Sequence, residues 1–239
     1  MRILVTGSKG QLGTELTNIA PQKHSIYGFD LDMDITKPAE IEEKFSKVKP
    51  AVAIHCAAIT DVDGCEDKKD LTYLVNTRGT ENLAKVCQKY GADLLFISSD
   101  YVFDGAKGRP YVETDAPNPL SVYGDSKYQA EKIIKGLLDN YYILRTTGIY
   151  SKYGKNFVDT VIKAGRQKEE LNIVNDQICT PTYSLDLAEC IYSLLDLGKY
   201  GIYHATNNGG CSWYDFTAEI FKILQINTQL LPIESSRLG

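Results

Sequence analysis

The chain opens with a buried strand that runs into a glycine-spaced turn and then into a helix. An apolar run, Ile3–Val5, precedes Gly7, Gly10 and Gly13. Glycines at this spacing permit a tight turn and a close approach of the backbone to a pyrophosphate, and the following helix offers its N-terminal N–H groups to the anion. The spacing is G-x-x-G-x-x-G, and such a turn also serves simple helix–strand packing. We expect the chain to begin with a dinucleotide-binding βα unit.

Short apolar strands alternate with amphipathic helices along most of the chain. This alternation predicts a parallel sheet covered by helices on both faces, which is the doubly wound, Rossmann-type α/β fold. The expected strands are Arg2–Thr6, Ser25–Asp30, Ala51–Ala57, Leu94–Ser99, Tyr141–Arg145 and Gly201–Ala205. The expected helices are Gln11–Ala20, Pro38–Lys47, Thr72–Tyr90, Val122–Leu138, Phe157–Arg166, Leu185–Leu197 and Trp213–Leu224.

The alternation loosens after about residue 145, which suggests two parts. We expect residues 1–145 to form the dinucleotide-binding domain, with some later segments packing back onto it. Residues 146–239 are expected to form mainly a smaller C-terminal substrate-binding lobe.

Composition excludes several classes of protein. The 239 residues are 43% apolar and carry a net charge of −5, which is ordinary for a globular protein and argues against a nucleic-acid partner. The six cysteines form no C-x-x-C pair, which favours reduced thiols in the cytoplasm, and the three histidines share no metal-ligand spacing. No apolar stretch is long enough to cross a bilayer. We therefore expect a cytoplasmic protein without a catalytic metal or membrane association.

Ligands of such sheets lie beyond the carboxyl ends of the strands, and the expected dinucleotide site lies there. Asp30 ends the second strand, where a carboxylate accepts hydrogen bonds from ribose hydroxyls and repels a 2′-phosphate, so NADH is slightly favoured over NADPH. A solvated loop acid is the alternative interpretation. Small residues after the third strand leave room for the nicotinamide ribose. The expected cofactor-binding set is Gly7, Lys9, Gly10, Gln11, Leu12, Gly13, Asp30, Asp34, Ile35, Ala57, Ala58, Thr60, Tyr123 and Lys127.

A Tyr-x-x-x-Lys pair provides candidate catalytic groups. Tyr123 and Lys127 are four residues apart and share one helix face. An ammonium beside the phenol is expected to lower the phenol pKa from its usual value near 10, which eases proton exchange. Ser99 ends a predicted strand and is placed to hydrogen bond a substrate carbonyl. Together with the glycine turn, these residues predict carbonyl reduction by hydride transfer from a nicotinamide, with Tyr123 as the acid.

At these residues the chain resembles the extended short-chain dehydrogenase/reductases and, more closely, the dTDP-4-dehydrorhamnose reductase family. The resemblance covers nearly the whole chain, and its most specific stretches are Ser98–Gly105 and Asn118–Lys127. It implies Ser99, Tyr123 and Lys127 as the catalytic group, and reduction of the 4-keto group of a dTDP-6-deoxy sugar with NADPH or NADH. It also suggests substrate contacts from Asp100 and Tyr101, which a purely structural turn would explain equally well. Asn156 and Phe157 are further candidates for contact with the nucleotide, or a simple apolar helix start.

Three departures from the family pattern leave the substrate open. The catalytic hydroxyl is usually threonine, and here it is Ser99. Many members carry Ser-Trp after an Ile-Leu-Arg-Thr run, whereas this chain continues Thr147-Gly148, so an aromatic facing the sugar is missing. The chain ends soon after Pro232-Ile233, which suggests a C-terminally shortened lobe.

Two other functions stay open at this point. One is a nucleotide-sugar epimerase or dehydratase that retains and recycles its cofactor. The other is a non-catalytic regulatory subunit that resembles the methionine adenosyltransferase β subunit. The expected partners are a nucleotide sugar and possibly a second copy of the chain in a homodimer.

Overall fold

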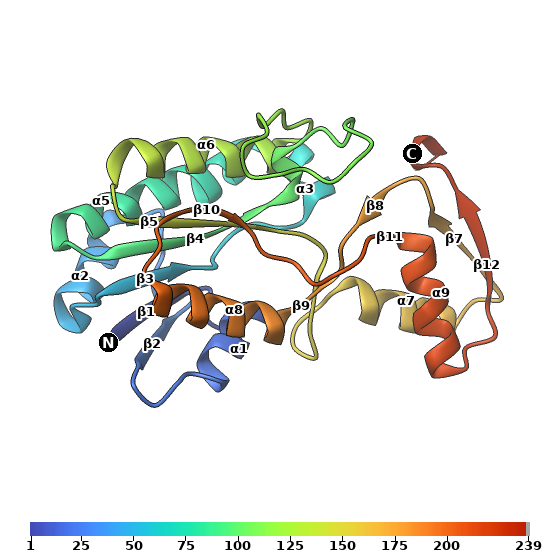
Figure 1. Ribbon diagram of the computed structural model, residues 1–239, viewed down its shortest axis with the longest axis horizontal. Coiled ribbons are helices and arrows are strands. Elements are labelled where there is room, and N and C mark those ends of the chain that lie inside the picture. The colour runs from blue at the N-terminus through green and yellow to red at the C-terminus, as the bar shows by residue number, and fades with distance from the viewer. Residues whose placement is uncertain (238–239) are drawn as a thin grey trace.

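Six parallel strands form the central sheet of the computed structural model, which describes residues 1–237 (Figure 1). The strand order is β10-β5-β4-β3-β1-β2. The predicted doubly wound α/β fold is confirmed, and each predicted strand lies within two residues of its observed bounds at either end. The strands are β1 (Arg2–Thr6), β2 (Ser25–Phe29), β3 (Val52–His55), β4 (Asp93–Ser99), β5 (Tyr141–Thr146) and β10 (Gly201–His204).

Helices cover both faces of this sheet and bury a separate apolar layer on each. One layer contains Leu95 and Ile97 of β4, and the other contains Leu94 and Phe96, because successive strand side chains point to opposite faces. The first layer is covered by α1 (Gln11–Asn18) and α8 (Ser184–Leu197). The second is covered by α2 (Pro38–Val48), α5 (Thr80–Tyr90) and α6 (Val122–Leu137).

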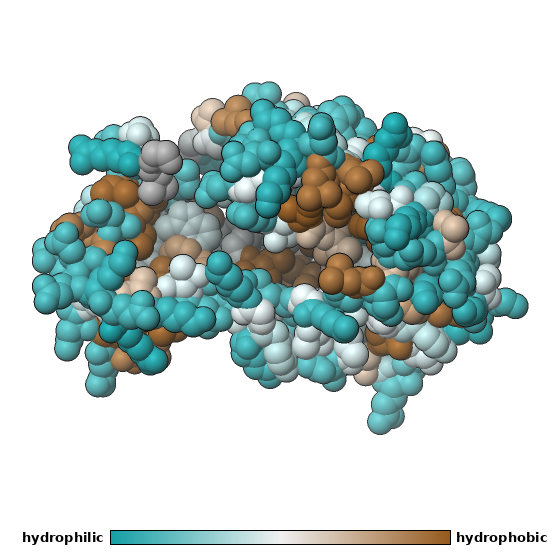
Figure 2. Space-filling view, turned by 180° about the vertical axis from the view of Figure 1, so that it is seen from behind, coloured by the Kyte–Doolittle hydropathy of each residue, from teal (hydrophilic) through white to brown (hydrophobic). Residues whose placement is uncertain are grey.

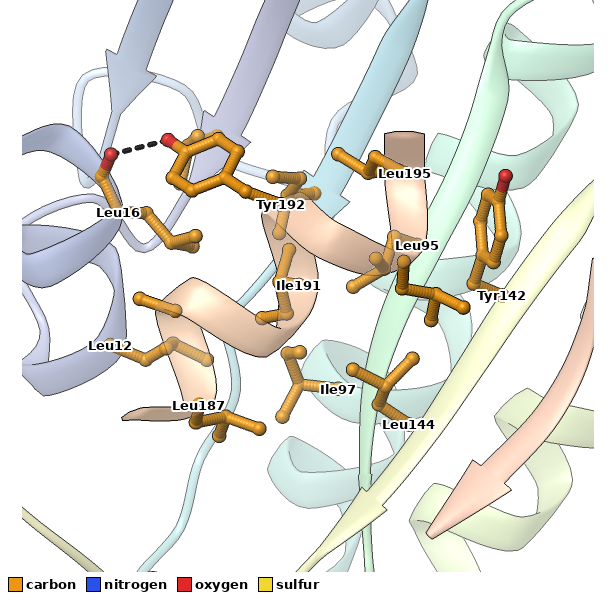
Figure 3. Packing of buried hydrophobic residues seen from close by; sticks show 14 of the residues in the cluster. Leu12, Leu16, Leu95, Ile97, Tyr142, Leu144, Leu187, Ile191, Tyr192 and Leu195 are labelled. Carbon is orange, nitrogen blue, oxygen red and sulfur yellow. Dashed lines mark hydrogen bonds between the residues drawn. The ribbon is translucent and has the colours of Figure 1, made fainter. Parts of the chain in front are cut away.

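Helix α8 shows how the sequence pattern produces this packing. Leu187, Ile191 and Leu195 recur every four residues and lie in the first apolar layer, against the sheet (Figure 3). On the same helix, the Tyr192 hydroxyl donates a hydrogen bond to the carbonyl of Leu16 in α1. This bond satisfies a buried phenol and fixes α8 beside α1.

The segment between β3 and α5 differs from the single helix predicted over Thr72–Tyr90. It contains α3 (Val62–Asp67), α4 (Lys69–Thr72) and a π-helix, η1 (Tyr73–Gly79), before α5. An ideal Cβ on Gly79 would lie 2.7 Å from the Ile35 side chain, so the π-helical turn packs very closely on the β2–α2 loop. Apolar periodicity does not separate a π-helical turn from an α-helix, so the sequence could not reveal this change.

The remaining elements gather at one end of the molecule, on the right of Figure 1. Helix α7 (Phe157–Gly165) packs against α9 (Trp213–Leu224), whose N-terminus carries a full capping box formed by Ser212 and Asp215. An apolar cluster of Val161, Leu171, Ile220 and Phe221 lies between these elements. The short strands here were not predicted, since most have two residues and no alternation to detect. These elements are β6 (Ile149–Tyr150), β7 (Glu170–Val174), β8 (Ile178–Cys179), β9 (Thr182–Tyr183), β11 (Cys211–Ser212), β12 (Gln229–Ile233) and the 3₁₀ turn η3 (Ser235–Arg237). A further 3₁₀ turn, η2 (Asp100–Val102), directly follows β4 and packs on α6.

Across residues 1–237, no helix combines the length and the apolar character that a membrane crossing requires.

A buried hydrogen-bonded chain ties β1 and β3 to α5. The Thr80 hydroxyl donates to the Asn76 carbonyl at 2.6 Å, so it accepts from Nε2 of His55 at 3.0 Å. Nδ1 of His55 is then the acceptor for the Thr6 hydroxyl at 2.7 Å, and Thr6 in turn accepts from the Ala57 N–H at 3.1 Å. This network holds His55 as a neutral imidazole with its proton on Nε2.

This network predicts a loss of stability in mild acid. Burial lowers the pKa of His55 to about 3 from 6.5. Between these values the unfolded chain binds a proton that the folded protein excludes, so the free energy of unfolding falls as pH falls below 6.5, by on the order of 1 kcal/mol per pH unit. Urea unfolding at pH 7, 6 and 5 measures this slope. His55→Gln should show a shallower slope than the wild type, and equal slopes would contradict the assignment.

Candidate active site

The glycine turn lies at the point where the strand order reverses. Strands β2 and β3 flank β1 on opposite sides, and such a switch point opens a crevice at the carboxyl ends of the strands. Gly7 has a φ of +64°, and a Cβ there would lie 2.7 Å from the Ala57 nitrogen. A Cβ on Gly13 would lie 2.3 Å from the Gly7 carbonyl oxygen. The turn therefore requires glycine at both positions to close against β3 and α1.

The start of α1 presents a backbone site for an anion. Gly10 is its N-cap and provides no capping side chain, and the first N–H groups of a helix lack intrahelical acceptors. Gln11 reaches from this turn to the loop after β6, donating to the Lys155 carbonyl at 3.3 Å.

Figure 2 shows the surface hollowed between the sheet and the α7–α9 end, with apolar residues exposed in the hollow. Leu12 is buried in the core beneath, and the Lys9 side chain is exposed beside the turn.

Asp30 closes the far side of the turn. One carboxylate oxygen accepts the Lys9 N–H at 3.1 Å, and the other accepts the Leu31 N–H at 2.9 Å. Each oxygen keeps a further lone pair for a ribose hydroxyl. Asp30 thus shapes the turn through both of its carboxylate oxygens.

The other expected cofactor-binding residues differ in burial and in hydrogen bonding. Ala57 and Ala58 are partly buried beside the glycine turn, and Thr60 is exposed in the loop that follows. Asp34 accepts from the N–H and the hydroxyl of Thr36, just before α2. Ile35 is buried in the second apolar layer. The Asp34 and Ile35 side chains therefore have local structural roles, and their contact with a cofactor stays a prediction.

The three expected catalytic residues converge at the end of β4. Tyr123 and Lys127 lie one turn apart near the start of α6, and all three residues are at most 9% exposed. A Cβ on Gly124 would lie 2.1 Å from the Tyr101 carbonyl oxygen, so α6 begins in direct contact with η2. Ser99 lies close enough to the Tyr123 phenol to influence its pKa. The arrangement places an acid and a hydroxyl together at the carboxyl edge of the sheet.

Burial dominates the electrostatics of these groups. It raises the pKa of Tyr123 above its ordinary value and lowers that of Lys127 to about 7, since desolvation disfavours both charged forms. The expectation that Lys127 lowers the phenol pKa is therefore not met by the protein alone. The Lys127 Nζ lies 4.1 Å from the ring centroid of Phe96. Tyr123 is accordingly a protonated phenol at neutral pH, suited to donating a proton.

Asp100 and Tyr101 border the same place. The Ser99 hydroxyl donates to the Asp100 carboxylate at 3.0 Å and accepts from the Tyr101 N–H at 3.2 Å. Burial raises the pKa of Asp100, with hydrogen bonds to Thr147 and Ser99 opposing that shift. The Tyr101 ring meets that of Tyr123 edge-on, 5.6 Å between centroids, and is 40% exposed. Both residues thus lie within contact range of anything bound at Tyr123.

The two candidates at the start of α7, Asn156 and Phe157, differ in the contacts that their side chains already make. The Asn156 amide caps α7 by accepting from the Asp159 N–H at 3.1 Å, and it donates to the Ser151 carbonyl at 2.8 Å. Both of its polar atoms are therefore used within its own segment. Phe157 packs against Trp213 with ring centroids 4.5 Å apart.

Sequence reasoning missed Trp213 as a site residue. A Cβ on Gly148 would lie 3.4 Å from the outer edge of the Trp213 indole. Gly148 follows Thr147, which lies close enough to Asp100 to influence its pKa, so the indole of α9 packs on the segment that borders Asp100. The signal was the glycine itself, because its missing side chain leaves room for an aromatic from elsewhere in the fold.

Asn76 of the π-helix, a residue that the sequence suggests for either the active-site hydrogen-bond network or a packing role, connects two segments next to the site. Its amide donates to the Ile59 carbonyl at 3.0 Å and to the Ser126 hydroxyl at 3.1 Å, and its oxygen accepts the Ile59 N–H at 2.8 Å. It thereby joins the loop after β3 to the turn of α6 that carries Lys127. Within the described part of the chain, no group of three or more side chains has the arrangement of a metal site.

Comparison with known proteins gives a consistent result. The family model described as the RmlD substrate binding domain matches residues 1–238. A dTDP-4-dehydrorhamnose reductase from Aggregatibacter actinomycetemcomitans is 38% identical over 229 residues, covering 92% of this chain and 78% of the relative. The crystal structure of a dTDP-4-dehydrorhamnose reductase from Clostridium acetobutylicum is 41% identical, with a TM-score of 0.97, covering 100% of this chain and 86% of that one. That of a dTDP-4-dehydrorhamnose reductase from Bacillus anthracis, in complex with NADP, is 40% identical, with a TM-score of 0.96, covering 100% of this chain and 85% of that one.

The geometry of the turn predicts a specific loss of dinucleotide binding. Gly13→Ala places a methyl group against the Gly7 carbonyl, so the turn must open and NADH affinity should fall at least tenfold, for a loss of about 1.4 kcal/mol. Gly136→Ala is the matched control, because a Cβ there meets nothing within 4 Å. Titration of NADH fluorescence measures both variants. Unchanged affinity in Gly13→Ala would refute the dinucleotide site.

Proposed function

The chain belongs to the RmlD substrate binding domain family, within the extended short-chain dehydrogenase/reductases, and from this we propose that it reduces the 4-keto group of a dTDP-activated 6-deoxy sugar. The reaction would use NADH or NADPH and serve dTDP-L-rhamnose synthesis. One observation supports the proposal: Tyr123 and Lys127 lie one turn apart where α6 packs on β4 and on the turn after Ser99, at the carboxyl edge of a parallel sheet whose glycine turn suits a dinucleotide.

The chemistry follows from the protonation and placement of these groups. A bound reduced nicotinamide supplies a hydride to the ketone carbon. Tyr123, whose pKa is raised by burial, donates its phenol proton to the carbonyl oxygen as negative charge develops there. Ser99 steadies that oxygen by hydrogen bonding, and Lys127 holds the nicotinamide ribose hydroxyls.

The substrate is proposed to lie between this group and the elements after residue 145. Asp100 and Tyr101 would contact the sugar, since they flank Ser99 and Tyr123. Phe157 and Trp213 offer an aromatic wall on the other side, on which a base or a sugar ring can pack. Asn156 would support this wall through its cap on α7.

We propose NADH as the slightly preferred cofactor. Asp30 keeps lone pairs free beside the turn, and its charge opposes a 2′-phosphate. The cytoplasmic location and the homodimer stay predictions from the sequence.

A direct assay tests the function. Purified protein is mixed with NADH or NADPH and a panel of 4-keto nucleotide sugars, and loss of the reduced nicotinamide absorbance is followed. Trp213 is the chain's one tryptophan, so quenching of its fluorescence by dTDP reports binding separately from turnover. We expect one reduced nicotinamide to be oxidised for each dTDP-4-keto sugar that is reduced. Binding with a retained cofactor and no net oxidation would indicate an epimerase or dehydratase, and no turnover with a co-purifying enzyme would indicate a regulatory subunit.

Loss of the proposed acid should separate binding from chemistry. Tyr123→Phe removes only the hydroxyl, so NADH affinity should stay near the wild-type value while turnover falls by roughly a hundredfold or more. Steady-state kinetics and NADH titration measure the two effects. Tyr73→Phe serves as the matched control, since its phenol donates to Asp125 on the outer side of α6. Surviving turnover in Tyr123→Phe would remove Tyr123 from the role of acid.

Cofactor preference should respond to the charge of Asp30. Asp30→Asn keeps an acceptor for the Lys9 N–H but removes the negative charge, so the NADPH-to-NADH ratio of kcat/KM should rise roughly fivefold, for about 1 kcal/mol of lost repulsion. Asp30→Ala should also relax the preference, with a further loss of affinity as the turn loosens. Asp32→Asn is the control, and an unchanged ratio in Asp30→Asn would exclude Asp30 from the ribose site.

A further inference from the structure

A buried ion pair lies directly behind the catalytic turn of α6. Arg145, near the end of β5, contacts Glu131 through two parallel hydrogen bonds, Nε to Oε1 at 2.9 Å and Nη2 to Oε2 at 2.7 Å. Ser98 adds a third donor, with its hydroxyl 2.6 Å from Oε1. Glu131 is 1% exposed and Arg145 is 4% exposed. Three donors thus satisfy a carboxylate that is cut off from water.

The pair connects the two elements that carry the catalytic residues. Ser98 immediately precedes Ser99, and it is the register partner of Arg145 across β4 and β5. Glu131 lies one helical turn after Lys127, on the buried side of α6. The ion pair therefore fixes the helix that carries Tyr123 and Lys127 against the strand that ends at Ser99.

A stabilising role alone does not explain this arrangement. Burying two charges costs several kcal/mol per ion, and apolar residues of similar volume often replace such pairs without loss of stability. The location of the charges is the more informative feature, since the pair lies beside a lysine whose own charge is disfavoured by burial.

The charges around Lys127 are few. His55 and Cys56 approach it from the end of β3, and Tyr123 and Glu131 lie on its own helix. Burial lowers the pKa of Lys127 to about 7, and Cys56 and Glu131 oppose that shift. Of these four neighbours, Glu131 is the one carboxylate, and it is the group that Arg145 contacts directly.

Arg145 meets further charges on its other side. Its guanidinium lies 5.1 Å from the Phe103 ring centroid, and Glu113 and His204 face it from the loop after η2 and from β10. The Glu113 carboxylate accepts the backbone N–H of His204 at 2.9 Å. Glu131 is the carboxylate that bonds the Arg145 guanidinium directly.

We propose that Glu131 and Arg145 are positioning residues of the active site: the pair aligns α6 with Ser99, and its carboxylate favours the ammonium form of Lys127 that receives the cofactor. This inference rests on the proposed function for the identity of the reaction. It does not depend on the sugar, because the pair acts on Lys127 and on the dinucleotide that Lys127 holds.

The test uses cofactor binding as a function of pH. A dinucleotide is anionic and favours protonated Lys127, so NADH affinity should start to fall as pH rises through the pKa of Lys127 in the free protein. Glu131→Gln removes the nearby negative charge. The pH at which NADH affinity starts to fall, called the pH limit below, should then move to lower pH by on the order of one unit. Arg145→Lys keeps both charges of the pair, so the pH limit should stay at its wild-type value. The variant loses the two parallel hydrogen bonds to Glu131, so kcat with a dTDP-4-keto sugar should fall.

A double variant tests the same role of Glu131 if Glu131→Gln does not fold. Glu131→Leu/Arg145→Met replaces both charges with apolar side chains, and it should still show the limit at lower pH. Lys23→Met/Asp196→Leu is the matched control, since it removes an ion pair of 2.6 Å on the outside of α8 and should bind NADH like the wild type. A wild-type pH limit in a folded variant that lacks Glu131 would overturn the proposal.

The two proposals fail in different ways. If the wild type reduces no 4-keto nucleotide sugar while Glu131→Gln shifts the NADH limit, only the proposed function fails. If the wild type turns over and Glu131→Gln keeps the wild-type limit, only the positioning role fails.

Discussion

The contact between α6 and the end of β4 is the constraint on which the site depends. Gly124 lets the helix begin against the Tyr101 carbonyl, and no larger residue fits there because a Cβ would overlap that oxygen. Asn76 holds the next turn through Ser126, and Glu131 holds the one after through Arg145 and Ser98. Three successive turns are thus fixed by three different kinds of contact, which is why two side chains of one helix can face a serine on the sheet.

Burial and function are linked by the same contacts. A closely packed helix excludes water from Tyr123 and Lys127, and exclusion of water pushes both groups toward their neutral forms. For Tyr123 the neutral form is the proton donor that carbonyl reduction requires. For Lys127 it is the form that binds an anion less well, so the site needs compensating negative charge close by.

The sequence was sufficient for the sheet and insufficient for its far end. Continuous apolar runs located the inner strands β1, β3, β4 and β5, because parallel strands buried on both faces have few polar residues, and the edge strands β2 and β10 were predicted as well. The two-residue ladder of β8 with β11 has no such signal, and the π-helix around Asn76 has the same apolar spacing as an α-helix. The motifs located Ser99, Tyr123 and Lys127, but Trp213 reaches Gly148 from 65 positions along the chain and only the fold reveals that contact.

The protein alone does not lower the pKa of the Tyr123 phenol, for a related reason. A sequence shows that Tyr123 and Lys127 share a helix face, but it does not show how much water reaches them. In the fold, desolvation outweighs their mutual influence, so the pair alone does not produce an ionised phenol. Lys127 is instead left with a pKa close to neutrality, where binding of an anion and uptake of a proton favour each other. The negative charge of a bound dinucleotide would then favour the protonated form of Lys127, which burial under α6 disfavours.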